Sequence, residues 1–257
     1  MPFALITGAS KGIGKAIAET LAVRGYDILL VARSADLLEQ VSADIHASTG
    51  RICHWMAVDL TENQAAEKVF DWCNQNHYTV SVLVNNAGYG LSGHFEKYTS
   101  QEHTDMLMVN IITLTKLTRL FLPGLQLQPA AFILNIGSTA SYQAVPLLAA
   151  YAASKAYVLS FSRGLHRELK NTNVSVTCVC PGPTDTNFVN RANIGKKGQK
   201  AAEKFNMSPQ TVAHIAVESL LRRRPEVITG GLNKLSTFFV WLLPKSVVEG
   251  VAQKLYD

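Results

Sequence analysis

The chain has 257 residues, of which 47% are hydrophobic and 17% charged, and it carries a net charge of +5 with a pI of about 9.0. This length and composition exclude a disordered chain and fit one α/β domain, residues 1–257, with a sizeable core. The N-terminus enters an apolar run without the basic segment and cleavage site of a signal peptide, so we expect a cytoplasmic protein.

The positive charge does not by itself indicate a nucleic-acid-binding protein. Arg222, Arg223 and Arg224 close a predicted helix, and cations at a helix C-terminus stabilise its dipole. The lysines at 196, 197, 200 and 204 have no aromatic residues interleaved among them. We therefore expect no nucleic-acid partner, and a basic surface that attracts an anionic cofactor or substrate.

Short apolar runs alternate with helical patterns along the chain. Strands are expected at residues 3–7, 27–31, 52–58, 80–84, 131–137, 174–180 and 226–229. Helices are expected at residues 13–24, 35–49, 62–77, 102–128, 149–171 and 208–224. Because the strand runs Ile28–Val31 and Val82–Val84 are continuously apolar rather than alternating, both faces of the sheet should be covered. The predicted fold is a doubly wound (Rossmann) α/β structure with a mostly seven-stranded parallel sheet.

Two segments do not fit this alternation. Residues 184–207 are basic and carry Phe188, Ile194 and Phe205, which indicates a lid over a substrate site. Residues 232–257 form a C-terminal extension whose apolar run, Phe238 to Leu243, is far shorter than the roughly 20 residues of a membrane span. That run is expected to wall the substrate pocket or to pack between subunits rather than to contact a membrane, because apolar tails are more often core or interface.

A glycine-rich turn joins the first predicted strand to the first predicted helix. It reads Thr7-Gly8-Ala9-Ser10-Lys11-Gly12-Ile13-Gly14. A Walker A loop would need glycine at position 9 and serine or threonine at position 16, and both are alanine. A turn of this kind points backbone N–H groups and the positive end of the helix dipole at a ligand, which suits the phosphates of a dinucleotide.

The residues after the second and third strands indicate which dinucleotide is bound. A cofactor with a free ribose 2′-hydroxyl usually meets an acid after the second strand, but Ala32 and Arg33 stand there. Arg33, with Lys11 of the glycine turn, favours the 2′-phosphate of NADP(H). Asp59, after the third strand, fits two roles equally: an acceptor for the adenine amino group, or a cap before the next helix.

The catalytic residues are expected after the fourth and fifth strands. The segment NNAG, residues 85–88, lets a flat ligand approach the backbone closely. Tyr151 and Lys155 lie four residues apart in a predicted helix, so the ammonium can lower the pKa of the tyrosine from its usual value of about 10. Ser138 precedes Tyr151 by thirteen residues, at a strand end, and can hold a substrate oxygen beside the phenol.

The glycine turn, the NNAG segment and the Ser–Tyr–Lys set together resemble the short-chain dehydrogenase/reductase family, over about residues 3–190. The resemblance implies a fourth catalytic member, Asn110, which bends its helix and holds a water linked to Lys155; the alternative is an Asn on the helix surface. It also places the turn Pro181-Gly182 beside the nicotinamide. The implied cofactor contacts are Gly8, Ser10, Lys11, Gly12, Ile13, Gly14, Arg33, Asp59, Leu60, Asn86, Ala87, Gly88, Tyr151, Lys155, Pro181, Gly182, Thr184 and Thr186.

The resemblance implies an NADP(H)-dependent oxidoreductase that interconverts a carbonyl and an alcohol, assembled as a homodimer or homotetramer through helices 102–128 and 149–171. The C-terminal part is similar to members that act on lipid-like carbonyl compounds, so we expect a hydrophobic ketone, aldehyde or acyl-type substrate. A catalytically silent NADP(H)-binding sensor or scaffold is the alternative. No metal is expected, because the four cysteines lack the spacing of metal ligands: Cys53, Cys73, Cys178 and Cys180.

Overall fold

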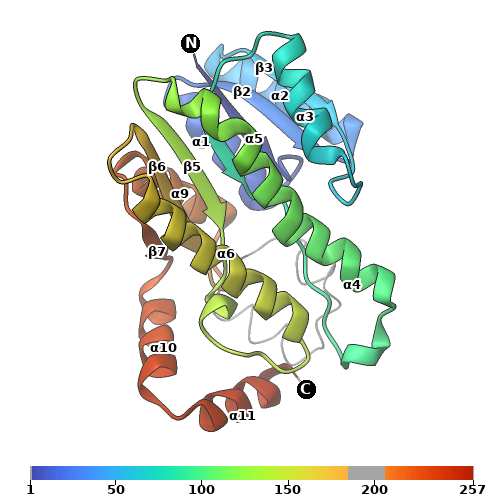
Figure 1. Ribbon diagram of the computed structural model, residues 1–257, viewed down its shortest axis with the longest axis vertical. Helices are drawn as coiled ribbons and strands as arrows, with labels where there is room; N and C mark the ends of the chain where they lie inside the picture. The colour runs from blue at the N-terminus through green and yellow to red at the C-terminus, as the bar shows by residue number, and fades with distance from the viewer. Residues whose placement is uncertain (1, 185–205, 257) are drawn as a thin grey trace.

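The computed structural model describes residues 2–184 and 206–256, and Figure 1 shows its elements. The strands are β1 (Phe3–Thr7), β2 (Asp27–Ala32), β3 (Cys53–Ala57), β4 (Val80–Asn85), β5 (Ala131–Ile136), β6 (Val174–Cys180) and β7 (Glu226–Ile228). The helices are α1 (Gly12–Val23), α2 (Ala35–Thr49), α3 (Ala65–Gln75), α4 (Ser100–Leu107), α5 (Leu114–Gln126), α6 (Ala149–Glu168), α9 (Pro209–Leu221), α10 (Gly231–Leu242) and α11 (Lys245–Tyr256). Two short 3-10 helices, η1 (Phe95–Lys97) and η3 (Thr139–Tyr142), and one π-helical segment, η2 (Met108–Thr113), complete the set.

The described strands pair in parallel in one sheet with the order β3-β2-β1-β4-β5-β6-β7. The predicted doubly wound fold is therefore confirmed. The register places Ile6 beside both Leu30 and Val84. The strand order reverses between β1 and β4, and in such sheets ligands bind at that reversal, beyond the carboxyl ends of the strands.

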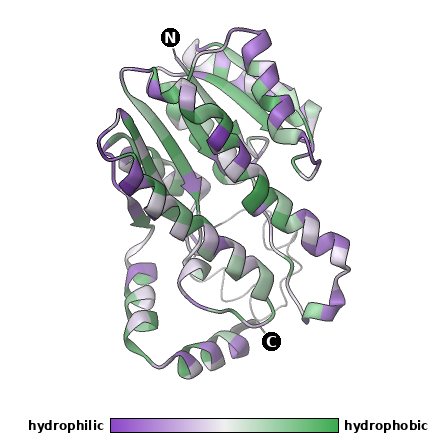
Figure 2. Ribbon diagram, viewed as in Figure 1, coloured by the Kyte–Doolittle hydropathy of each residue, from purple (hydrophilic) through white to green (hydrophobic). Residues whose placement is uncertain are grey.

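Helices cover both faces of the sheet (Figure 1). On one face α1, α2 and α9 bury side chains such as Leu21, Ile45 and Val217. On the other face α3 and α5 bury Val69 and Phe121, and α6 packs beside them. Figure 2 shows hydrophobic strands beneath helices that carry polar residues on their outer sides. Two apolar cores therefore hold the strand ends in fixed positions.

Local sequence explains several helix ends. α2 ends where Gly50 adopts a left-handed φ of 67° and donates its N–H to the His46 carbonyl at 2.8 Å. α9 begins after Ser208, whose hydroxyl accepts from the Thr211 N–H at 3.1 Å, with Pro209 at the first helical position. α9 ends at Leu221, with Arg222 at the C-cap position, so the arginine triplet follows the helix instead of closing it as the predicted range 208–224 implied.

Of the two segments that do not fit the alternation of strands and helices, the structure describes the C-terminal one and only the ends of the other. The expected C-terminal extension forms the helices α10 and α11, whereas the expected lid lies outside the described residues except for Thr184, Asn206 and Met207. Among the described helices, the continuous stretch Ser100–Gln126 is long and apolar enough to cross a membrane. Its residues Leu117 and Phe121 are buried against the sheet, however, as in the core helix of a globular domain.

Candidate active site

The glycine turn and the NNAG segment touch at the carboxyl ends of β1 and β4. Gly8 has a φ of 65°, and a Cβ there would lie 2.9 Å from the Cα of Ala87. A Cβ on Gly14, in the first turn of α1, would collide with the carbonyl oxygen of Gly8. Both positions exclude any side chain, so the backbone forms a concave cradle.

The first turn of α1 presents its N–H groups at this cradle. α1 begins at Gly12, and Lys11 at the N-cap position makes no capping hydrogen bond with its side chain. Ser10 and Ile13 are half-buried in the turn, whereas Lys11 is exposed. Helix N–H groups without a side-chain cap are a ready site for a phosphate. This donor set fits the pyrophosphate of a dinucleotide.

Hydrogen bonds made by Thr7 and Asn86 join the glycine turn to the NNAG segment. The Asn86 Nδ2 donates to the carbonyl oxygens of Thr7 and Gly8, at 2.9 and 3.2 Å. The buried Thr7 hydroxyl accepts from the backbone N–H groups of Asn86 and Ala87, at 3.0 and 3.1 Å. The two turns therefore form one hydrogen-bonded unit.

Arg33 and Asp59 lie together beyond β2 and β3. The exposed Arg33 guanidinium has its Nη1 3.7 Å from the Asp59 Oδ2. The Asp59 Oδ1 accepts from the backbone N–H and the hydroxyl of Thr61, at 3.0 and 2.9 Å, so Asp59 closes a local turn, whereas the N-cap position of α3 is Gln64. Contact of Asp59 with adenine stays a prediction. Leu60 is buried, and its carbonyl accepts from the Thr113 hydroxyl at 2.9 Å.

Tyr151 and Lys155 lie on α6 and are 8% and 5% exposed. The Lys155 Nζ donates to the Ile136 carbonyl at 2.7 Å and lies 6.0 Å from the centroid of the Tyr151 ring. Burial lowers the pKa of Lys155 to about 8, against the smaller opposing effect of the Cys178 and Cys180 thiols. Lys155 therefore stays mostly protonated at neutral pH and brings positive charge close to the phenol.

Ser138 follows β5 and begins η3 with an extended backbone. Its N–H donates to the Ser141 Oγ at 3.2 Å, and its own Oγ accepts from the Ala140 N–H at 3.1 Å. A serine hydroxyl that accepts one hydrogen bond can still donate its proton. Ala140 packs in the same apolar cluster as Tyr151, so the end of β5 and the start of α6 lie together.

Asn110 is 1% exposed, so the interpretation as a surface residue is wrong. It lies in the π-helical turn η2, where the sequence had predicted one continuous helix over residues 102–128. Its Oδ1 accepts from the Tyr89 N–H at 3.1 Å, and its Nδ2 donates to the Tyr89 carbonyl and the Ser154 Oγ at 2.9 and 3.0 Å. π-turns of this kind often occur at functional sites.

Gly88 brings Asn110 and Lys155 to one point. A Cβ on Gly88 would lie 3.0 Å from the Asn110 Oδ1 and 3.3 Å from the Lys155 Nζ. The chain therefore gathers the amide, the ammonium and the NNAG backbone from three separate elements. This convergence occurs at the carboxyl edge of the sheet, next to Tyr151.

The turn after β6 is tied to the same edge. Pro181 is buried, and its carbonyl accepts from the Thr139 N–H at 2.9 Å. Gly182 lies against the Asn233 side chain of α10, which a Cβ would strike. The Thr184 hydroxyl donates to the Gly182 carbonyl at 3.1 Å. Thr186 lies outside the described residues, so its predicted contact is not placed.

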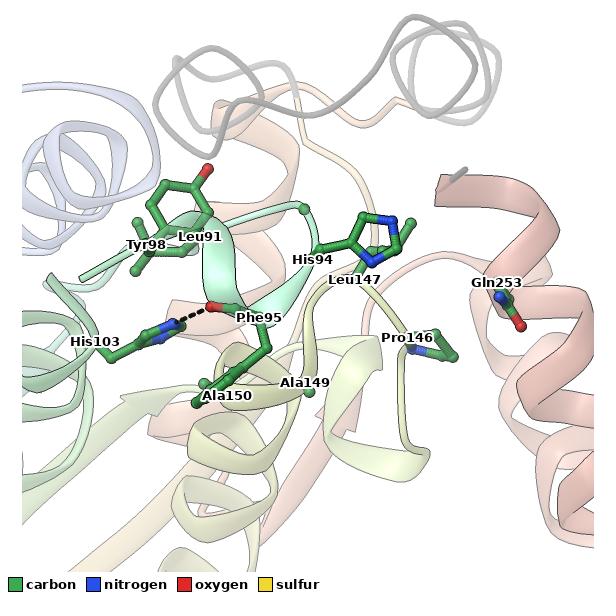
Figure 3. A pocket seen from close by; sticks show the side chains of 11 residues that line it. Leu91, His94, Phe95, Tyr98, His103, Pro146, Leu147, Ala149, Ala150 and Gln253 are labelled. Atoms are coloured by element: carbon green, nitrogen blue, oxygen red, sulfur yellow. Dashed lines mark hydrogen bonds between the residues drawn. The ribbon is translucent and has the colours of Figure 1, made fainter. Parts of the chain in front are cut away.

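A cavity of about 230 Å³ opens beside this site (Figure 3). The loop after β4, the turn before α6 and Gln253 of α11 line it, and most of the lining is apolar. Leu147 lines it with a φ of 65°, an uncommon conformation for leucine, and its carbonyl accepts from the Gly93 N–H at 2.8 Å. Two lining residues, Leu91 and Ala150, pack in the cluster that contains Tyr151.

Sequence reasoning missed three positioning residues. Thr7 organises the cradle, Ser141 accepts from the Ser138 N–H, and Ser154 links α6 to Asn110. Each is a buried hydroxyl, at 2%, 8% and 0% exposure. A small hydroxyl in an otherwise apolar segment is the one signal in the sequence that indicates such a role. In the described residues no group of three or more His, Cys, Asp and Glu side chains is placed to hold a metal.

The strand order and the glycine cradle define a dinucleotide-binding α/β protein. The sequence profile of the short chain dehydrogenases matches residues 2–197. A very-long-chain 3-oxoacyl-CoA reductase of Anas platyrhynchos is 38% identical over 185 residues, which are 70% of this chain and 58% of that protein. An uncharacterized oxidoreductase of Staphylococcus saprophyticus is 30% identical over 217 residues, covering 84% of this chain and 90% of that protein.

The fold agrees with these matches. A short-chain dehydrogenase from Sphingobium yanoikuyae, solved in complex with NADPH, superposes with a TM-score of 0.82 at 28% identity, over 96% of this chain and 98% of that one. The chain belongs to the short-chain dehydrogenase family, a family of oxidoreductases that bind a nicotinamide cofactor. It spans little more than half the length of the curated acyl-CoA reductases that it matches.

Proposed function

We propose that the chain is an NADP(H)-dependent enzyme that interconverts a carbonyl and an alcohol on a hydrophobic ketone, aldehyde or acyl-type substrate. The observation that carries the proposal is the convergence of Tyr151, Lys155, Asn110 and Gly88 at the carboxyl edge of the sheet, with Ser138 at the end of β5. When bound there, the nicotinamide cofactor supplies or accepts the hydride.

The four polar side chains divide the remaining work. Ser138 donates a hydrogen bond that orients the substrate oxygen, and Tyr151 gives its phenol proton to that oxygen in the reductive direction. Protonated Lys155 lowers the cost of the resulting phenolate and holds the ribose of the cofactor. Asn110 fixes the backbone at Tyr89 and, through a bound water, connects Lys155 to solvent protons. In the oxidative direction Tyr151 acts as the base.

Preference for NADP(H) over NAD(H) rests on Arg33 and Lys11. Both are exposed at the two ends of the predicted adenosine site, and no carboxylate stands directly after β2 to repel a 2′-phosphate. Asp59 lies 3.7 Å from Arg33 and so orients the guanidinium without occupying the position next to the strand.

The apolar cavity supports a hydrophobic substrate. Its lining is mostly aliphatic and aromatic, with His94, His103 and Gln253 among its polar members. In Figure 3 the His103 ring is held by the Phe95 carbonyl, 3.1 Å from Nε2. The name of the Anas platyrhynchos relative, a very-long-chain 3-oxoacyl-CoA reductase, is consistent with an acyl chain in this cavity.

We also infer self-association through the outer faces of the stretch Ser100–Gln126 and of α6, where Ile112 of η2 and Tyr157 of α6 are 42% and 37% exposed. A homodimer or homotetramer built on this face would cover both side chains. Light scattering on the purified chain, compared with an Ile112→Lys variant, tests the inference; an unchanged mass in the variant would contradict it.

The test of the enzymatic proposal is NADPH oxidation with 3-oxoacyl thioesters and ketones of increasing chain length. Turnover should rise with chain length, and Tyr151→Phe should lower it by about 10²–10⁴-fold while NADPH binding persists. The matched control is Tyr157→Phe, which removes an exposed hydroxyl from the same helix and should retain activity. Tight NADPH binding without turnover on any compound would instead support the sensor or scaffold.

A further inference from the structure

α10 is amphipathic, but most of its large apolar side chains point toward solvent and not toward the domain. The residues that it turns toward the domain include two polar ones: Thr237 is buried and Asn233 half-buried, as is Val240, and Asn233 donates to the Thr229 carbonyl at 2.8 Å. The Thr237 hydroxyl is satisfied by the Asn233 carbonyl at 3.0 Å. Most of the large apolar side chains of the helix are therefore left on its solvent side.

The exposed apolar side chains of α10 continue onto α11, and we call this set the C-terminal apolar face. Its members are Leu232, Leu235, Phe238, Phe239, Trp241, Leu242, Leu243, Val247 and Val251, which are 43–79% exposed. In the rest of the described chain, large exposed apolar residues are scattered over separate elements, and of these Ile112 and Tyr157 border one surface hollow: Val23, Leu37, Ile52, Phe95, Ile112, Leu127 and Tyr157. Single residues of this kind are ordinary, but a contiguous set marks a docking surface.

We propose that the C-terminal apolar face lies on the surface of a lipid bilayer that contains anionic headgroups. α10 has twelve residues and is about 18 Å long, so it is too short to span the apolar core but long enough to lie in the interface. Trp241, Phe238 and Phe239 are the residue types that bury in the headgroup region. Figure 1 shows both helices projecting beyond the sheet, at the end where its strands terminate.

The charged residues around the C-terminal apolar face favour an anionic lipid surface over a second copy of the chain as its partner. Lys234, Lys245 and Lys254 are exposed around the face, and the one carboxylate within residues 231–254 is the half-buried Glu249. A two-fold interface built on this face would bring the same positive patch onto itself. An anionic bilayer instead complements it, because basic side chains flanking an apolar helix face add electrostatic attraction to apolar burial.

The face adjoins the substrate cavity. α11 packs on the domain through Val248 and Ala252, and Ala252 joins the cluster that contains Tyr151. Gln253, the next residue, lines the cavity together with Ala149 and Ala150. A substrate with a long apolar chain would then pass from the bilayer into the cavity beside α11. Only this last step rests on the proposed function; the membrane contact stands without it.

The test uses the full chain and sedimented vesicles of phosphatidylcholine with and without phosphatidylglycerol. The chain should bind the anionic vesicles, and Phe238→Ser/Trp241→Ser should lower the partition coefficient by at least about tenfold. The matched control is Val23→Ser/Leu127→Ser, which removes equally exposed apolar side chains from α1 and from the end of α5 and should bind as the wild type does. Lys234→Gln/Lys245→Gln should remove most of the preference for anionic lipid.

Two further measurements separate the outcomes. Brominated lipids should quench the Trp241 emission in a Trp55→Phe/Trp72→Phe background, which locates the contact at this helix. Light scattering on Phe238→Ser/Trp241→Ser should show an unchanged mass. Absence of vesicle binding, equal binding by the Phe238/Trp241 variant, or a loss of oligomer in that variant without lipid binding would each overturn the proposal. An unchanged circular dichroism spectrum of each variant verifies folding, so the result is independent of whether NADPH binds or any carbonyl substrate is turned over.

Discussion

Replacing Lys155 by methionine should stabilise the cofactor-free protein while it abolishes catalysis. Methionine keeps the length of the buried side chain and removes its charge. In the folded chain burial lowers the pKa of Lys155 to about 8, whereas the value in the unfolded chain is near 10.5. This difference corresponds to about 3 kcal/mol of unfavourable free energy for holding the ammonium in the folded protein at pH 7.

Part of the stability gained by removing the buried ammonium is offset by the loss of a hydrogen bond. The Lys155 Nζ donates to the Ile136 carbonyl at 2.7 Å, and losing this hydrogen bond costs about 1 kcal/mol. The net gain at pH 7 is therefore about 2 kcal/mol, or a rise in Tm of about 4–8 °C for a chain of this size. Between pH 8 and 10.5 the unfolded wild type binds more protons than the folded protein, so wild-type stability rises with pH and the advantage of the variant disappears.

The assay is urea unfolding without cofactor, at pH 7, 8.5 and 10, for the wild type and Lys155→Met. The control is Lys170→Met, in which an exposed lysine is replaced; its effect should be small and independent of pH. A Lys155→Met variant that is destabilised by the same amount at every pH would refute the argument that burial is the main cause of the lowered pKa of this lysine.

Three further changes test the cofactor site and its support. Arg33→Asp should raise the KM for NADPH by about 10–100-fold and change the KM for NADH little, because only the 2′-phosphate needs the guanidinium; equal effects on both cofactors would argue against that role. Gly137→Ala would place a Cβ 2.9 Å from the Cys180 Sγ and should lower the free energy of unfolding by about 1–3 kcal/mol, whereas Gly164→Ala, with open space around it, should not. Thr7→Val leaves two backbone N–H groups without their acceptor and should cost about 2 kcal/mol, while Thr7→Ser should restore most of the loss in the same urea titration.

The sheet could be predicted from the sequence because its central strands are mostly apolar on both faces. β2, β4, β5 and β6 are buried along their whole length, and only a few small polar residues such as Ser81, Asn135 and Thr177 interrupt their apolar runs. In a parallel sheet the residues after each strand meet at one edge. The positions of Gly8, Arg33 and Ser138 relative to that edge therefore follow from the strand ends alone.

The links between these residues could not be predicted in the same way. Asn110 and Ser154 are 44 residues apart in sequence, and their hydrogen bond depends on how α6 packs against η2. The π-turn itself leaves no trace in Met108–Thr113, because its residues also suit an ordinary helix. The orientation of α10 could not be predicted for a related reason. Its apolar residues indicate that the helix has an apolar face, but not whether that face points toward the domain or toward solvent.

The π-turn η2 also changes the helical phase between α4 and α5. One residue more than an α-turn rotates everything after it by about 100° around the axis. Met106, before the turn, can therefore pack with Tyr151, while Leu117 and Phe121, after it, lie on the sheet. The continuous helical stretch Ser100–Gln126 therefore contributes side chains to two separate apolar clusters. Deleting one residue from Met108–Thr113 would change the helical phase, so that the stretch could keep its contacts with only one of the two clusters.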